Sequence, residues 1–343
     1  MSRSWRWIVG SVLAIFCTAT TVVAYDVFFS IPRVGQIVSV NIPEQATAST
    51  AADALAHAGV IRSSLIYRVL SFFASSAQHP HAGTYVLSPG MNLITIAHRL
   101  AAGPMREERT WLVREGETLE DETQLLVDHA SFDPRRMAQV AGGSKNSSPF
   151  DPAWREEFPF LRQVPVSRSL EGYAFPETYR VWTDQLPESL IRKQLQQFSV
   201  RFGSTSPGPA SAPLTTLDQV VTLASIVEKE VQTPRDRRLV AGIFLRRLRV
   251  GMPLQSDATL TYITGSMRGR ATRAELTLDS PYNTYLSLGL PPSPISNPGE
   301  DAIRSVLNPI QSPYLYFLTD AKGTVLYAKT LDEHARNRTK AGY

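Results

Sequence analysis

The feature of this sequence that most constrains its fold is a long apolar segment near the N-terminus. Residues from Ile8 to Phe29 are apolar or small, and the only charged side chain among them is Asp26. A helix needs about 20 residues to cross the hydrocarbon core of a bilayer, so this segment is long enough. The segment therefore predicts one membrane-spanning helix, which leaves the remaining residues after position 29 to form the globular part of the chain.

Basic residues predict the orientation of this helix. Arg3 and Arg6 precede the apolar segment, and such charges favour the cytoplasmic side of a membrane. Residues 1–7 would then be a cytoplasmic stub and residues 8–29 a helix in the inner (cytoplasmic) membrane. A cleaved signal peptide is the alternative, because the small residues at 22–24 resemble a cleavage site. Both interpretations export the bulk of the chain.

The composition and the absence of certain motifs exclude several classes of function. The 343 residues are 43% hydrophobic, enough for buried cores in about two domains, and carry a net charge of only +4. No basic run is interleaved with aromatic residues, so nucleic acid is not an expected partner. The single cysteine, Cys17, allows neither an intramolecular disulfide nor a cysteine metal site. We find no HExxH spacing, P-loop or Gly-x-Ser-x-Gly elbow, and predict no metal and no cofactor.

The part of the chain directly after the apolar segment, residues 30–115, has the pattern of a small α+β module. Apolar residues at helical spacing predict two helices over 46–75 and another over 94–100, which ends at Gly103. Short strands are predicted at 83–87 and 111–113. We assign this module to residues 30–115, followed by a connecting helical region at 116–160 and a second domain at 161–343.

Within the second domain, residues 217–231 predict a buried helix that ends in two glutamates. The apolar residues of this segment surround the helix axis almost completely. At 100° per residue, Glu230 projects about 20° from Leu223, toward the bulkier apolar side, whereas Glu228 projects toward smaller residues. Desolvation would raise the pKa of Glu230 and keep a fraction protonated near neutral pH, as a general acid requires. The alternative is an ordinary solvated helix end.

Two polar stretches follow. Gln255, Asp257 and Thr259 alternate along the sequence, which predicts one polar side of an extended strand. Further on, Tyr282, Asn283 and Tyr285 offer aromatic faces and an amide, groups that suit sugar rings. Near the C-terminus, residues 314–318 and 324–328 predict a β-hairpin.

These motifs resemble the membrane-bound endolytic murein transglycosylases of the YceG-like family. The resemblance is strong over residues 160–340 and looser over 30–130. It implies a fold of α+β class: a small LysM-like module followed by a mixed α/β catalytic domain, on one N-terminal transmembrane helix. The matching stretches are LEGYAFPETY at 170–179, ASIVEKE at 224–230, GMPLQSDAT at 251–259, SPYNTYLSLGLPPSPISNP at 280–298, PYLYF at 313–317 and TLDEHARN at 330–337.

The resemblance also implies roles for single residues. The catalytic glutamate of the family is the second Glu of the EKE motif, which is Glu230, with Glu228 as the alternative. The remaining residues fall in motifs that line the family's cleft and are expected to bind substrate; they are Gln255, Asp257, Thr259, Tyr282, Asn283, Tyr285 and Glu177. The sequence departs from the family pattern at Arg246, Ala258 and Val231, none of which removes the carboxylate.

The family activity is endolytic cleavage of MurNAc–GlcNAc bonds in peptidoglycan, which leaves 1,6-anhydro-MurNAc ends and is expected to end nascent strands. Glycan strands are thus the expected partner, with peptidoglycan synthases as possible neighbours. Glu228, Asp257 and Glu177 keep hydrolysis with a second carboxylate open. A non-catalytic glycan-binding protein and a scaffold of the division or elongation machinery are the rival interpretations.

Overall fold

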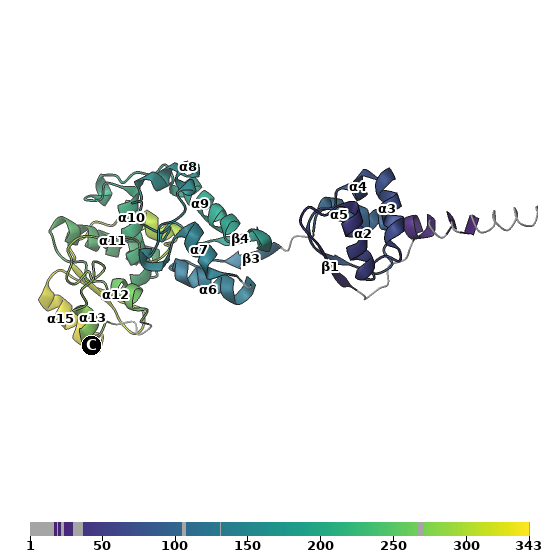
Figure 1. Ribbon diagram of the computed structural model, residues 1–343. Helices are drawn as coiled ribbons and strands as arrows, with labels where there is room; N and C mark the ends of the chain where they lie inside the picture. The colour runs from purple at the N-terminus through teal and green to yellow at the C-terminus, as the bar shows by residue number, and fades with distance from the viewer. Residues whose placement is uncertain are drawn as a thin grey trace, which may run out of the picture. The chain divides into compact units, whose positions relative to one another are not determined.

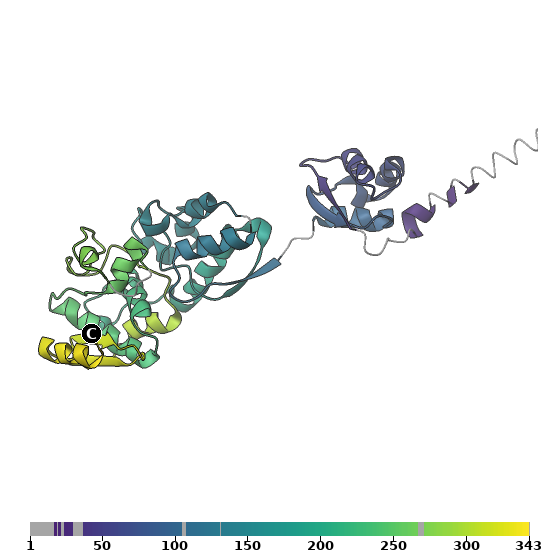
Figure 2. The ribbon, with the colours of Figure 1, turned by 90° about the horizontal axis from the view of Figure 1, so that it is seen from below.

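The structure is a computed structural model. It divides into two compact units, Met1–Arg106 and Glu107–Tyr343 (Figures 1 and 2). The predicted cytoplasmic stub and most of the predicted membrane helix lie outside the described residues. Within the part that is described, no helix is both long and apolar enough to cross a membrane. The described residues are 17–18, 20–21, 24–29, 37–104, 108–130, 132–266 and 271–342.

The first unit contains a small α+β module with its own core. Its elements are η1 (Tyr25–Phe29), β1 (Val38–Ile42), α2 (Ala48–His57), α3 (Ser64–Phe73), α4 (Ser75–Gln78), β2 (Gly83–Leu87) and α5 (Leu93–Ala102). Strands β1 and β2 pair antiparallel, and the residues of β1 from Ser39 to Ile42 are alternately exposed and buried. The hydroxyl of Thr47 caps α2 by accepting a hydrogen bond from the N–H of Thr50. The predicted strand at 83–87 and the predicted helix end at Gly103 are confirmed.

The second unit is mainly helical. Its strands are β3 (Glu108–Leu112), β4 (Thr178–Trp182), β5 (Tyr316–Thr319) and β6 (Val325–Ala328). Its helices are α6 (Leu119–Ala130), α7 (Pro134–Ala141), α8 (Ala153–Glu157), α9 (Glu188–Phe202), α10 (Leu217–Glu230), α11 (Pro234–Arg249), α12 (Asp257–Thr264), α13 (Arg273–Leu276), α14 (Glu300–Leu307) and α15 (Leu331–Lys340). Short 3-10 turns are η2 (Ser144–Asn146), η3 (Pro159–Gln163), η4 (Thr183–Gln185) and η5 (Pro209–Ser211).

The strands of the second unit form two separate antiparallel pairs, β3 with β4 and β5 with β6. Among the residues described, this unit is therefore α+β, where the sequence led us to expect a mixed α/β domain. The pair β5–β6 confirms the predicted hairpin. The pair β3–β4 joins segments about 70 residues apart, so residues 108–112, which we grouped by sequence with the first module, belong to the second unit.

Helix α10 is the central element of the second core. It begins with a capping box, in which the hydroxyl of Thr216 accepts from the N–H of Gln219 and the Gln219 side chain accepts from the N–H of Thr216. Its side chains are buried from Leu217 to Val227 with the exception of Gln219, and it packs against α11, α12 and α14. A helix that is apolar almost all round is stable only inside a core, as the sequence predicted.

The predicted strand at Gln255–Thr259 is wrong. The chain turns at Gln255, whose φ of 52° is left-handed, and then enters helix α12 at Asp257. Serine and aspartate favour helix starts because their short polar side chains suit the free N–H groups there. The alternating polar residues therefore mark a turn and a helix N-terminus, not one side of a strand.

Candidate active site

Glu230 is the last residue of α10, where the buried helix reaches the edge of the core. The hydroxyl of Ser256 donates a hydrogen bond to its carboxylate. Withdrawal of the carboxyl from water disfavours the charged form and raises the pKa of Glu230 to about 7. Near neutral pH the protonated and ionised forms are therefore both well populated, which is what a group that acts first as acid and then as base requires.

Ser256 is fixed by the loop that carries the second polar stretch. Its N–H donates to the hydroxyl of Thr284 at 3.0 Å, and the N–H of Gln255 donates to the carbonyl of Thr284 at 3.0 Å. Ser256 itself is buried and occupies the N-cap position of α12. Sequence analysis did not single out Ser256, and the signal that could have found it was its place just before an aspartate at a helix start.

Asp257 and Tyr285 form the next part of the site. The hydroxyl of Tyr285 donates to the Asp257 carboxylate at 2.6 Å, which joins α12 to the loop after α13. The negative charge of Asp257 adds to the effect of burial and further raises the pKa of Glu230. Burial and the neighbouring Asp257 also raise the pKa of Tyr285, so this phenol stays protonated and acts as a donor.

Arg247 brings a buried positive charge close to the acid. Its guanidinium donates to the carbonyls of Leu254 at 2.6 Å and Leu315 at 2.7 Å, and lies 5.4 Å from the ring centroid of Tyr316. Its charge lowers the pKa of Glu230, against the effects of burial and Asp257. Sequence analysis missed Arg247, because one arginine among three in the last turn of α11 has no distinguishing pattern.

Glu228 has a different environment from Glu230. Its carboxylate pairs with Arg237 at 2.5 Å and accepts a hydrogen bond from the N–H of Gly299 at 3.0 Å. Burial raises the pKa of Glu228, and the positive charge of Arg237 opposes that effect. Both oxygens are thus used in internal contacts, which makes Glu228 a structural ion-pair residue that ties α10 to α11 and to the start of α14.

Three other predicted site residues brace the loop around Glu230. The Asn283 amide donates to two backbone carbonyls of the preceding segment at 2.9 and 3.1 Å. The Tyr282 and Ser293 hydroxyls are 2.6 Å apart, and the Thr259 and Thr284 hydroxyls are 3.0 Å apart. All three predicted residues are buried, so they fix the loop that positions Ser256 and Tyr285.

The remaining two predicted residues differ in their relation to Glu230. Gln255 is exposed directly beside Ser256, where its side chain is free to meet a ligand. Glu177 pairs instead with Arg201 of α9 at 2.9 Å, and none of its contacts joins it to the group around Glu230. The structure therefore brings together all the predicted site residues after position 250 and leaves Glu177 apart from them.

Two further carboxyls are fully buried in the same unit. Glu122 of α6 accepts a hydrogen bond from the Gln194 amide at 2.8 Å, and Glu171 accepts from the N–H of Leu119 at 3.2 Å. Burial raises the pKa of each to about 8. These are core groups, and among the described residues no three His, Cys, Asp or Glu side chains are grouped as metal ligands.

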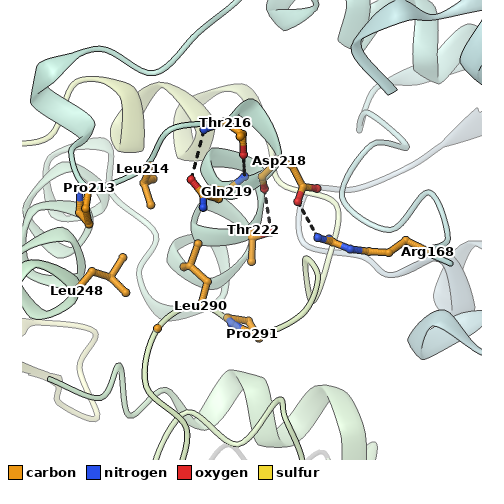
Figure 3. Close-up of a pocket in the computed structure, with 11 residues that line it drawn as sticks. Arg168, Pro213, Leu214, Thr216, Asp218, Gln219, Thr222, Leu248, Leu290 and Pro291 are labelled. Carbon is orange, nitrogen blue, oxygen red and sulfur yellow. Dashed lines mark hydrogen bonds and ion pairs between the residues drawn. The ribbon is translucent and has the colours of Figure 1, made fainter. Parts of the chain in front are cut away.

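A pocket of about 450 Å³ lies at the opposite end of α10 (Figure 3). Arg168 and Asp218 meet on its wall in an ion pair of 2.6 Å, and Leu248 and Leu290 supply apolar surface. Glu230 follows Asp218 by twelve positions along α10, which places the ion pair about 18 Å along the helix from the acid. The pocket is therefore separate from the group around Glu230.

The described geometry can be compared with known proteins. The YceG-like family matches residues 40–340, which cover about two thirds of the first unit and nearly all of the second. The chain belongs to the YceG-like family. It is 30% identical over 309 residues to a protein of Bacillus subtilis (strain 168) named endolytic murein transglycosylase, covering 88% of this chain and 84% of the relative.

Two more relatives of this YceG-like protein support the assignment. An endolytic murein transglycosylase of Streptococcus pneumoniae serotype 2 is 32% identical over 320 residues, which cover 88% of this chain and 57% of that protein. A crystal structure of a yceG-like protein from Listeria monocytogenes is similar in fold, with a TM-score of 0.55 and 28% identity over 88% of this chain and 99% of that one.

The three departures from the family pattern lie outside the contacts of the Glu230 carboxyl. Val231 is buried and its carbonyl accepts from Arg237 at 3.3 Å. Arg246 donates to the carbonyl of Ser312 at 3.3 Å, and Ala258 packs on the edge of the core. These substitutions alter the support of the site and not its reacting group.

Proposed function

We propose that this YceG-like protein is a peptidoglycan lytic transglycosylase with Glu230 as its acid and base. The observation that carries the proposal is the Glu230 carboxyl itself, which burial gives a pKa of about 7 and which Ser256 holds by a hydrogen bond. The names of the relatives supply the substrate class, murein, and the endolytic mode of action.

The reaction needs one carboxyl that changes role. Protonated Glu230 donates its proton to the oxygen of the MurNAc–GlcNAc bond as the C1–O bond breaks. The 6-hydroxyl of the same MurNAc then bonds to C1 and returns its proton to the Glu230 carboxylate. No water is consumed, the products are a free GlcNAc hydroxyl and a 1,6-anhydro-MurNAc end, and the enzyme regains its starting protonation state.

The contacts of the other carboxylates favour this single-acid mechanism over hydrolysis. A glycoside hydrolase commonly uses two carboxyl groups on opposite sides of the bond. Glu228 is held by Arg237 and Glu177 by Arg201, while Asp257 accepts from Tyr285. Among the carboxylates of the described residues, Asp257 is the one whose charge acts on Glu230, and it favours the protonated form of the acid.

The place of action is part of the same proposal. Residues 8–29 anchor the chain in the inner membrane with residues 1–7 in the cytoplasm, and both units act on the outer side. The first unit serves as a LysM-like module, and the second is the catalytic unit. An enzyme held at the membrane meets strands as synthases extend them, so endolytic cuts there would end nascent strands.

The test is digestion of purified sacculi by the full chain in detergent, compared with Glu230→Gln, and analysis of the products by mass spectrometry. We expect anhydro-ended fragments from the native protein and a loss of at least about 100-fold in the variant. Equal melting temperatures of the two proteins would show that the variant is folded. Products that carry an added water would instead indicate a hydrolase, and no products from either protein would favour a binding or scaffold role.

A further inference from the structure

Helix α3 of the first unit is apolar on two opposite faces. Tyr67 is fully buried against the module core, as expected for the inner face of a surface helix. On the outer face, four large apolar side chains stand in solvent: Leu65 is 67% exposed, Val69 48%, Phe72 80% and Phe73 85%. At 100° per residue these four span an arc of about 100°, which we call the α3 stripe. Contiguous apolar surface of this kind marks an interaction site.

The module that carries the α3 stripe is continuous with the apolar N-terminal segment. Val27, near the end of that segment, is buried in the module core, and η1 packs against α5. If residues 8–29 cross the bilayer, this packing holds the module at the membrane surface.

The charge of the module suits an anionic surface. Residues 30–106 contain five arginines and two acidic residues, Glu44 and Asp53, which gives a net charge of +3. Arg62 is exposed two residues before α3, and Arg68, on α3 about 40° from Phe72 around the helix, is partly exposed and pairs with Asp53 at 2.6 Å. Apolar side chains flanked by arginine are the pattern of helices that lie in the interface of a bilayer with anionic lipids.

We propose that the α3 stripe docks on the outer surface of the lipid bilayer and orients the module against the membrane. This proposal rests on the membrane anchor of the proposed function, since the anchor supplies the proximity. A single helix lets a module rotate and tilt freely, whereas a second contact made by Phe72 and Phe73 restricts the module to one orientation. The side chains inserted are those that now stand unpartnered in water.

The test places nitroxide labels on the full chain in vesicles of phosphatidylcholine and phosphatidylglycerol. In a Cys17→Ser background, single cysteines replace Phe73 on the stripe, Leu13 in the apolar segment, or Val86, an exposed valine on β2 that lies off the stripe. Collision with oxygen reports lipid, and collision with a nickel chelate reports water. We expect the labels at Phe73→Cys and Leu13→Cys to be reached by oxygen, and the label at Val86→Cys by nickel.

The three label positions distinguish a failure of the docking proposal from a failure of the membrane anchor. A label in lipid at Leu13→Cys, with water at Phe73→Cys as at Val86→Cys, would overturn the docking and keep the anchor. Water at Leu13→Cys would overturn the anchor and the docking that depends on it. A label at Phe73→Cys hidden from both reagents, with spin–spin broadening between chains, would show that a second copy covers the stripe instead of lipid.

Discussion

Ser256 controls the protonation of Glu230 in a direction that can be measured. Its hydrogen bond stabilises the carboxylate and so lowers the pKa of Glu230, against the larger effect of burial. In Ser256→Ala that donor is lost and the pKa of Glu230 rises above its present value of about 7. Because the acid must be protonated to donate, activity in the variant should persist to higher pH. We expect the alkaline limb of kcat/KM against pH to move upward.

Ser256→Thr is the matched control for this prediction, because it keeps the hydroxyl at the same position of α12. Its alkaline limb should stay near that of the native protein, whatever its overall rate. A purely structural role for Ser256 would lower kcat in the alanine variant without moving the limb. If the alkaline limb of Ser256→Ala did not move, the hydrogen bond from Ser256 would not be what lowers the pKa of Glu230.

Substitution of Glu228 should lower the stability of the fold, whereas substitution of Glu230 should remove the activity. Glu228→Ala removes the partner of Arg237, a guanidinium that is almost entirely buried. Removal of one member of a buried ion pair costs about 3–5 kcal/mol because a charge is left without a partner. Glu115 and Asp301 lie 3.7 and 3.9 Å from Arg237, so we expect the lower end of that range in chemical denaturation. The anhydro products should remain, and their loss in a folded variant would assign Glu228 to the reaction.

Sequence could separate the two glutamates only partly. The helical wheel selected Glu230 from the apolar bulk around it, and the structure shows that burial does raise its pKa. The wheel could not show that Glu228 is held in an ion pair, since its partner Arg237 lies on the next helix. Ser256 and Arg247 were missed because both act on Glu230 from other elements, Ser256 through a hydrogen bond and Arg247 through its charge. A single helix does not specify its neighbours.

At the scale of elements, the sequence predicted the helices and strands that depend on residues close together in the chain. The buried helix α10, strand β2 and the hairpin β5–β6 all follow from residues within one short window. Strand β4 was not predicted, because its pairing with β3 joins distant parts of the chain. The start of α12 was misread because polar residues at alternate positions fit both a strand face and a capped helix N-terminus, and the loop at Thr284 decides between them.

The buried carboxyl between α6 and α9 should make stability depend on pH. Burial raises the pKa of Glu122 from 4.5 to about 8, so the folded state binds more protons than the unfolded state between those values. Stability must then fall as pH rises through that window, by up to about 1.4 kcal/mol per pH unit for each such group. Glu122→Gln should flatten the fall in thermal stability between pH 5 and 8, leaving the share of Glu171.

Glu120→Gln is the control, since Glu120 is an exposed carboxyl on the same helix. It should reproduce the native dependence of melting temperature on pH. A native protein whose melting temperature rises from pH 5 to 8 would contradict the prediction, because such a rise requires carboxyls that bind protons more weakly in the folded state than in the unfolded state.

At the scale of the whole molecule, the chain divides into two compact units. Each has its own hydrophobic core, and no described residue of the first core is shared with the cores of the second unit. The sequence predicted a first module at 30–115, a connecting region at 116–160 and a second domain at 161–343. It placed the boundary of the first module at 115, whereas the strand pairing of β3 draws residues 108–112 into the second unit.

Separate cores predict separate unfolding. Leu55 is fully buried in the first core and Leu195 in the second. Truncation of a buried leucine costs about 2–5 kcal/mol through lost burial and the cavity left behind. In calorimetry of the full chain in detergent, Leu55→Ala should lower one transition and Leu195→Ala another. If either variant instead moved a single shared transition, the two cores would be coupled, and the α3 stripe could not dock on a membrane independently of the catalytic unit.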